Sequence, residues 1–348
     1  MTPPPATATH RHPALDQTLI VRTRNFVGDV VLALPALERL DQAGYRLHLV
    51  GKGWLGNLFA AYDWPVSVYP KRISDRLRLL RSLRPAERRH HSIDAITFAT
   101  SFSSAVEMRL AGLRPFGYRC EGRSPFLAGG AAIVRGEHAL ASYWRLVSAL
   151  LREEKPPPPA ATLRLSARAH AAAAAVRQAR GIEAGYLVVV PFAGGTFEKI
   201  DKRWPGFDVL VPRLLATGRQ VVIAPGPGEE NEALARFTGA SILPGLDLGT
   251  YTALMRDAAL TIANDTGPGH LVAAAGGALL SVLGPTKVEQ WGPLGPRVGI
   301  VQSWPEWPSV ERVFDAAMAR LADRSAGDQA SAVINAKWSG YQTDSVAM

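Results

Sequence analysis

The sequence is poor in cysteine and in long apolar runs. Its 348 residues include one cysteine, Cys120, so no disulfide can form within the chain, which fits a reducing compartment. Apolar stretches such as GALLSVLG are much shorter than the roughly 20 residues of a membrane-spanning helix. The N-terminal MTPPPATATHRHPALDQ has no apolar segment after a basic start, as a signal peptide would. We therefore expect a globular, cytoplasmic protein.

Several catalytic signatures are also missing. The sequence has no G-x-x-x-x-G-K-[ST] phosphate loop, no G-x-S-x-G elbow, no H-E-x-x-H and no D-x-D motif. His90 and His91 are adjacent and have no Cys or His at ligand spacing. GKGWLG (residues 51–56) matches G-x-G-x-x-G, but it follows the second strand and precedes no clear helix, which disfavours dinucleotide binding. We expect no metal ion and no other cofactor.

Acidic residues are fewer than basic ones. The 39 Lys and Arg exceed the 30 Asp and Glu by nine, and part of the excess lies in KRISDRLRLLRSLRPAERRHH, residues 71–91. Such a stretch favours an anionic partner, which could be a nucleic acid, phospholipid headgroups or a phosphorylated substrate. The alternative is a solvated helix face, because arginine is also a good helix former.

Apolar, β-branched runs alternate with helical patterns along most of the chain. Such alternation predicts parallel sheets covered by helices on both faces, and hence an α/β protein. The segment KPPPPAA, residues 155–161, is expected to be a stiff spacer between two halves. We predict two doubly wound, Rossmann-like domains facing each other, over residues 17–160 and 161–325. Residues 1–16 and 326–348 are expected to be loose tails.

Ligands bind at the carboxyl ends of parallel strands, so residues that follow strands are candidate site residues. In RNFVGDVV, Asp29 follows Gly28 at a turn from strand to helix, where a carboxylate can cap free backbone N–H groups. A role for Asp29 in a reaction is the second interpretation, and the local sequence leaves both open.

A second such corner is NDTGPGHLVAAAG, residues 264–276. A predicted strand is followed by Asp265 and Thr266, Gly267 allows a close backbone approach, and His270 lies just inside the next helix. A helix N-terminus with glycines is suited to bind phosphate. The alternative is a capped turn without a ligand.

Two further corners lie between these. In PFAGGTFEKIDKRWPGF, glycines and Thr196 follow a strand, and Lys202 and Arg203 precede a helix start, a combination that suits a diphosphate. In APGPGEENEAL, Glu229 could accept hydrogen bonds from ribose hydroxyls. Equally, Glu229 and Glu230 could complement the dipole of the helix that follows.

Taken together, these motifs resemble those of the bacterial lipopolysaccharide heptosyltransferases, glycosyltransferase family 9. The similarity lies in NFVGDVVLALPALERL, KRWP and NDTGPGHLVAAAGGALLSVLGPTKVEQWGP, in family order over roughly residues 18–325. The resemblance implies the two-domain GT-B fold. It also implies transfer of a heptose from ADP-heptose to an inner-core sugar of lipopolysaccharide, with inversion at the anomeric carbon.

The resemblance also implies roles for particular residues. Asp29 would be the catalytic base, without a metal ion. The donor would be bound by Lys202, Asp265, Thr266, Gly267 and His270, together with Thr196 and Glu229. Because the basic stretch lies in the half that holds the acceptor in this fold, Gly28, Arg72 and Arg76 would contact an anionic glycolipid.

These expectations imply a cytoplasmic enzyme that associates transiently with the cytosolic face of the inner membrane and binds no nucleic acid. One alternative is a related GT-B transferase that uses another nucleotide sugar, or a protein or another glycan as acceptor. A second alternative is a non-catalytic nucleic-acid-binding protein, which would need neither Asp29 nor the NDTGPGH corner.

Overall fold

The computed structural model describes residues 17–85, 92–194, 196–197 and 200–322. The chain divides into two compact units. The last segment of the first unit ends at Pro158 and the main segment of the second begins at Pro159, inside the proline-rich segment. The second unit also includes two short earlier segments, Phe26–Val31 and Asn57–Tyr62, which the contiguous predicted bounds do not contain. The predicted tails and His90 and His91 lie outside the described residues.

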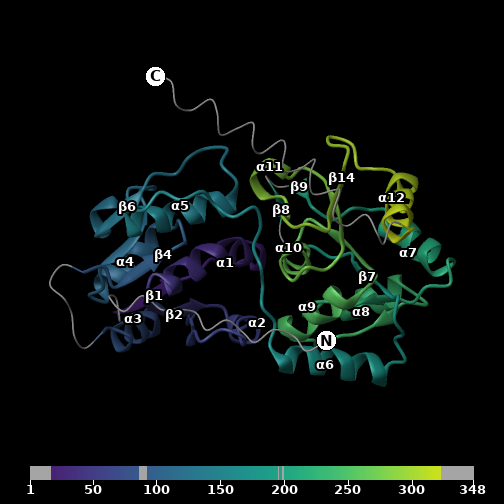
Figure 1. Cartoon of the computed structure of the whole chain (residues 1–348), viewed down its shortest axis with the longest axis horizontal. Helices are drawn as coiled ribbons and strands as arrows, with labels where there is room; N and C mark the ends of the chain where they lie inside the picture. The colour runs from purple at the N-terminus through teal and green to yellow at the C-terminus, as the bar shows by residue number, and fades with distance from the viewer. Residues whose placement is uncertain (1–16, 86–91, 195, 198–199, 323–348) are drawn as a thin grey trace, which may run out of the picture. The chain divides into compact units, whose positions relative to one another are not determined.

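The first unit contains a six-stranded parallel sheet with the order β3-β2-β1-β4-β5-β6 (Figure 1). This is the doubly wound order typical of Rossmann-like domains. Its strands are β1 (Gln17–Arg22), β2 (Tyr45–Gly51), β3 (Val66–Val68), β4 (Ala95–Thr97), β5 (Pro115–Tyr118) and β6 (Gly129–Ala131).

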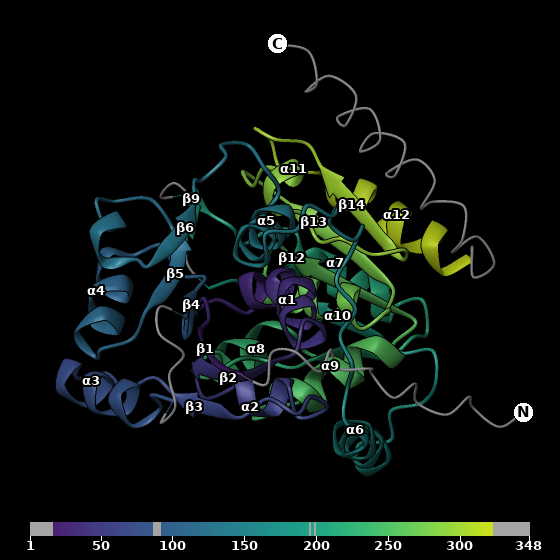
Figure 2. The same cartoon turned by 60° about the vertical axis from the view of Figure 1, so that its left-hand side comes forward.

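Helices cover both faces of this sheet. The views of Figures 1 and 2 agree that α3 and α4 lie on one face, and α1 and α5 on the other. The helices are α1 (Val27–Gln42), whose first turn is grouped with the second unit, α2 (Leu55–Leu58), α3 (Ile73–Ser82), α4 (Phe102–Leu110), the short 3-10 helix η1 (Ser124–Phe126) and α5 (Ala139–Leu151).

The second unit repeats the architecture with the strand order β11-β10-β7-β12-β13-β14, again all parallel. Its strands are β7 (Leu187–Val190), β10 (Val221–Ile223), β11 (Ser241–Ile242), β12 (Leu260–Asn264), β13 (Leu279–Leu283) and β14 (Val298–Gln302), with a separate antiparallel pair of β8 (Thr196–Phe197) and β9 (Ile200–Asp201). Its helices are α6 (Ala167–Ala179), α7 (Phe207–Leu215), α8 (Glu230–Arg236), α9 (Leu248–Asp257), α10 (Gly267–Ala274), α11 (Val288–Trp291) and α12 (Val310–Ala322).

The central strands β7, β12 and β13 are buried along their whole length. Their mostly apolar sequences follow from this position, since a parallel strand covered on both faces has no solvent side. Glycines follow the ends of α1 and α6. Gly44 and Gly181 take positive φ angles of 92° and 59° there, a conformation that commonly ends a helix. In the described part of the chain, no helix has the length and apolarity needed to cross a membrane.

Candidate functional site

The carboxyl end of β12 leads into the N-terminus of α10. Thr266 caps this helix with an extended backbone, and its hydroxyl accepts no hydrogen bond from the first helical turn. The same hydroxyl oxygen is buried and has no hydrogen-bond partner among the described residues. A buried polar atom without a partner is costly, so this helix N-terminus, where backbone N–H groups favour an anion, is suited to bind a ligand.

Asp265 pairs with a lysine from a distant loop. The Lys202 Nζ lies 2.6 Å from the Asp265 Oδ2, with the lysine side chain 20% and the aspartate side chain 7% exposed. The Thr286 hydroxyl donates a hydrogen bond to the same carboxylate oxygen. The sequence predicts Lys202 and Asp265 as site residues, and the structure brings them together in a charge-assisted contact.

Thr286 and Gln302 were not predicted. The Gln302 Nε2 donates to the backbone oxygens of Thr286, at 2.9 Å, and Gly284, at 2.7 Å, which fixes the loop after β13. Both side chains lie at the carboxyl end of a strand of this sheet. That position was the available signal, and for Thr286 it is joined by Gly284 and Lys287 in the same loop.

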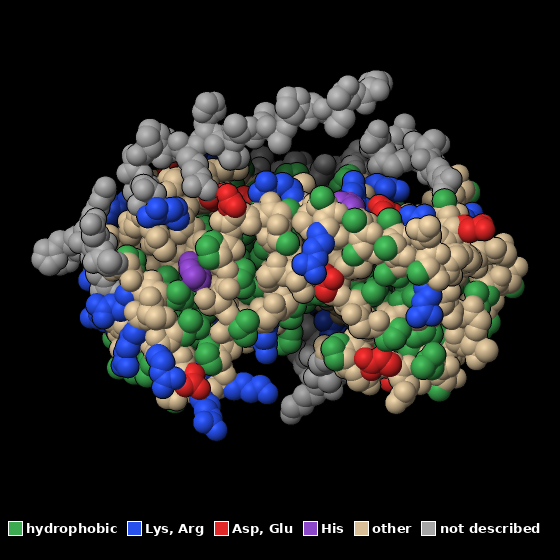
Figure 3. Space-filling view, turned by 90° about the horizontal axis from the view of Figure 1, so that it is seen from below, with side chains coloured by type: hydrophobic (Ala, Val, Ile, Leu, Met, Phe, Trp, Pro, Cys, Tyr) green, Lys and Arg blue, Asp and Glu red, His purple; other side chains and the backbone are tan. Residues whose placement is uncertain are grey.

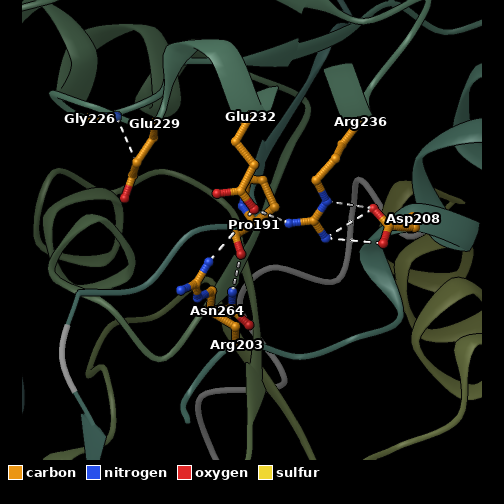
Figure 4. Close-up of polar contacts among 8 residues, drawn as sticks. All are labelled: Pro191, Arg203, Asp208, Gly226, Glu229, Glu232, Arg236 and Asn264. Carbon is orange, nitrogen blue, oxygen red and sulfur yellow. Dashed lines mark hydrogen bonds and ion pairs between the residues drawn. The ribbon is translucent and has the colours of Figure 1, made fainter. Parts of the chain in front are cut away.

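Asn264 holds the Lys-Arg-Trp-Pro segment against the end of β12. Its Oδ1 accepts a hydrogen bond from the Trp204 backbone N–H at 2.9 Å, and its Nδ2 donates to the Pro191 oxygen at 2.6 Å (Figure 4). The Trp204 indole N–H donates to the Pro308 oxygen at 2.9 Å. With Trp204 and Asn264 both buried, the backbone next to Lys202 is held in place.

The first turn of α1 reaches the same site within the second unit. The helix begins at Val27, so Asp29 lies inside its first turn and not at the turn before the helix. A Cβ atom built on Gly28 would lie 2.8 Å from the His270 Cδ2, so the glycine backbone packs directly on the imidazole. Any side chain at residue 28 would displace this ring. Asp29 itself is buried, at 9% exposure.

Burial lowers the pKa of His270 from its ordinary value of 6.5, and the negative charges of Asp265 and Asp29 oppose this effect. The imidazole is therefore neutral at neutral pH. Its Nδ1 is buried and has no hydrogen-bond partner among the described residues. The ring contributes a neutral polar group to the site, and the charges beside it come from Lys202, Asp265 and Asp29.

The lowered pKa of His270 predicts that the protein loses stability as the pH falls below 6.5. Below that pH the unfolded chain binds a proton on this imidazole, whereas the folded chain keeps it neutral, so protonation favours unfolding. Urea denaturation between pH 6.5 and about pH 5 should show this fall for the wild type and a flatter curve for His270→Gln. His170→Gln on α6 is the control and should keep the wild-type slope. Equal slopes for all three proteins would contradict the prediction.

Glu229 lies at the start of α8, and its carboxylate accepts a hydrogen bond from the turn before the helix. The Glu229 Oε2 accepts a hydrogen bond from the Gly226 N–H at 2.8 Å (Figure 4). The Glu230 Oε2 accepts one from the Gly228 N–H, also at 2.8 Å. Arg203 points toward α8, where its Nη1 lies 3.6 Å from the Glu232 Oε1. A ribose contact by Glu229 stays a prediction.

The remaining predicted residues have different surroundings. Thr196 pairs through its backbone with Asp201, and its side chain is outside what the structure describes, as is Gly195. Arg72 precedes α3 and is exposed. Arg76 donates to the Pro70 oxygen at 2.7 Å and to Glu107 at 3.1 Å within the first unit. Acceptor binding by Arg72 and Arg76 stays a prediction.

No cluster of three or more His, Cys, Asp or Glu side chains that could hold a metal ion occurs in the described ranges. The groups that the site presents to a ligand are an ammonium group, a helix N-terminus, a neutral imidazole, a threonine hydroxyl and two carboxylates. The cation and the helix N-terminus favour a phosphate group, and a carboxylate beside them can accept a proton.

Known proteins with the same architecture include sugar-transferring enzymes. The ADP-heptose lipopolysaccharide heptosyltransferase II of E. coli is similar with a TM-score of 0.73 and 18% identity, over 89% of this chain and 100% of that chain. A glycosyltransferase family 9 protein of Veillonella parvula gives 0.72 and 17%, over 90% and 100%. The E. coli heptosyltransferase WaaC with ADP gives 0.68 and 21%, over 87% and 99%. These similarities confirm the predicted GT-B fold.

A search of curated proteins finds no match. The model of glycosyltransferase family 9 (heptosyltransferase), in contrast, matches residues 76–320, which is most of the chain and includes the whole second sheet and strands β4, β5 and β6 of the first. The chain therefore belongs to glycosyltransferase family 9, the heptosyltransferase family, and is a glycosyltransferase.

Proposed function

We propose that this enzyme transfers a heptose from ADP-heptose to an inner-core sugar of lipopolysaccharide, with inversion at the anomeric carbon. The observation that carries the proposal is the buried cluster at the start of α10, where Lys202, the unpartnered Thr266 hydroxyl and the helix N-terminus converge. These groups suit a diphosphate. The E. coli enzyme WaaC is known in structures with ADP and with ADP-2-deoxy-2-fluoro heptose, which supports ADP-heptose as the donor class.

In the proposed reaction, the acceptor hydroxyl oxygen attacks the anomeric carbon of the donor. The bond from that carbon to the diphosphate oxygen breaks, and ADP leaves with the electron pair. Asp29 accepts the proton of the attacking hydroxyl, and attack from the side opposite to ADP inverts the anomeric carbon. Lys202 and the backbone N–H groups at the start of α10 stabilise the negative charge that grows on the leaving diphosphate.

Asp265 has a positioning role in this proposal. Its carboxylate already holds the Lys202 ammonium at 2.6 Å, so the cation is in place before the donor binds. Thr286 fixes the orientation of that carboxylate. Preorganised charges cost no reorganisation when the reaction occurs, which is the main source of electrostatic catalysis. With His270 neutral, the positive charge beside the diphosphate comes from the lysine and the helix N-terminus.

We further propose that the acceptor is an anionic glycolipid and that the enzyme works at the cytosolic face of the inner membrane as a peripheral protein. Gly28 would border the acceptor hydroxyl, since it precedes Asp29 and packs on His270. A donor-binding contact from Glu229 to the ribose and one from Thr196 to the diphosphate belong to the same proposal.

Thermal denaturation with a panel of nucleotide sugars tests the donor. ADP-heptose at a hundred times its Kd should stabilise the protein by about 2.7 kcal/mol, whereas a UDP-sugar and a GDP-sugar at the same concentration should have little effect. A transfer assay with acceptors from the Kdo-lipid A level upward then identifies the product. Stronger stabilisation by a UDP- or GDP-sugar would show that the enzyme is a related transferase with another donor.

A further inference from the structure

The outward side of α3 in the first unit carries a basic surface, of which Arg72 is a predicted acceptor contact and the other residues have no part in the proposed reaction. The helix turns Leu80 into the core and packs Leu77 and Leu83 against it, at a spacing of three residues. Its opposite side is exposed, as expected of a helix with one apolar stripe. The exposed residues that we call the α3 face are Lys71, Arg72, Ile73, Arg78, Arg81 and Arg84.

The charges of the α3 face are of one sign. From Lys71 to Pro85 the sequence contains a single acid, Asp75, and its carboxylate is bonded to Arg78 at 2.9 Å. Arg76 is not part of the face, because Glu107 and the Pro70 oxygen hold its guanidinium inward. Figure 3 shows Lys and Arg side chains gathered on the part of the first unit where α3 lies.

Exposed aliphatic side chains border these cations. Ile73 at the start of α3 is 59% exposed, and Val68 at the end of β3 is 60% exposed. At the other end of α3 the Arg84 guanidinium lies beside Gly112, since a Cβ built there would be 3.2 Å from its Nη1. Leu110, which ends α4 two residues before Gly112, is 59% exposed.

We propose that the α3 face binds an anionic phospholipid bilayer. Exposed cations together with exposed aliphatic side chains suit a surface that lies against an anionic membrane, where the cations meet headgroups and the apolar side chains enter the acyl boundary. The ten residues of α3 spread the charge over about 15 Å, which suits an extended surface better than one phosphate. A nucleic acid would leave Ile73 and Leu110 without a partner.

The inference extends the proposed function, in which the acceptor is a glycolipid, but it does not depend on the donor. Its test therefore uses vesicles without any sugar acceptor. Co-sedimentation of the full chain is measured with vesicles of phosphatidylglycerol and phosphatidylcholine, and with phosphatidylcholine alone. We expect binding to the anionic vesicles, weakening as salt rises, and little binding to neutral ones.

The double variant Arg81→Gln/Arg84→Gln should lower the partition coefficient on anionic vesicles about thirtyfold, because each cation near such a surface contributes about fivefold. The matched control Arg168→Gln/Arg180→Gln removes two exposed arginines of the second unit and should retain wild-type binding. Ile73→Ser should weaken binding in high salt, where charge attraction is screened.

Stabilisation by ADP should be the same in the wild type and both double variants, so a failed donor proposal and a failed membrane proposal are distinguishable. No binding to anionic vesicles, or an equal loss in both double variants, would overturn the inference. Binding of duplex DNA that depends on Arg81 and Arg84, without vesicle binding, would overturn it in favour of a nucleic-acid surface.

Discussion

Asp29→Asn is expected to lower kcat for sugar transfer by about 10²- to 10⁴-fold, the range that a general base contributes. The amide has the shape of the carboxylate but cannot accept the proton of the acceptor hydroxyl. Donor affinity should stay near the wild-type value, because Asp29 contacts the acceptor in the proposed reaction and the diphosphate is bound by other groups. The expected signature is therefore a loss in kcat without a matching change in donor KM.

The position of Asp29 supports this expectation. It lies in the first turn of α1, where the helix dipole favours a negative charge, and it is buried. Its charge acts on His270, on whose ring the neighbouring Gly28 packs. A carboxylate in this position is next to the groups that would bind the diphosphate, which a general base for glycosyl transfer requires.

Initial rates with ADP-heptose and a Kdo-lipid A acceptor measure the effect, and thermal stabilisation by ADP checks that the donor site is intact. Asp41→Asn is the matched control, because Asp41 lies in the last turn of the same helix, far along the chain from the site. It should transfer sugar at the wild-type rate. Near wild-type transfer by Asp29→Asn would show that another group takes the proton.

The fold was predictable because most elements carry a periodic signal. The buried strands β7, β12 and β13 are mostly apolar, and turn glycines separate them from helices. Helix α9 was missed although Asp247 caps it with hydrogen bonds to the Gly249 and Thr250 N–H groups. Seven of its ten residues are buried, so it has no polar face and gives no helical period.

The candidate site was predictable only in part. Lys202 and Asp265 stand out because each lies beside glycines or charges at a strand end, and the family resemblance joins them. Gln302 has no such neighbours, and the roles of both Thr286 and Gln302 depend on hydrogen bonds between segments distant in sequence. The packing of Gly28 on His270 likewise depends on tertiary contact, which local sequence patterns do not encode.

Lys202→Ala should reduce donor affinity and kcat together, with kcat/KM falling by about 10²- to 10³-fold, the loss typical of removing one group that stabilises a developing anion. The cause is twofold. The diphosphate loses a cation, and the Asp265 carboxylate, 7% exposed, is left without its partner and repels the donor. Lys52→Ala, at an exposed lysine of the first unit, is the control and should retain activity.

The double variant Lys202→Ala/Asp265→Asn separates the two causes. Removing the unpaired carboxylate should recover the stability that Lys202→Ala loses, because the cost of the single variant lies in an uncompensated buried charge. If the lysine acts on the diphosphate, the double variant stays as slow as the single one. If it only neutralises Asp265, transfer recovers with stability, and the lysine has no direct role in the reaction. Calorimetric binding of ADP and the free energy of unfolding in urea, measured on the wild type, Lys202→Ala, Asp265→Asn and the double variant, give both comparisons as double-mutant cycles.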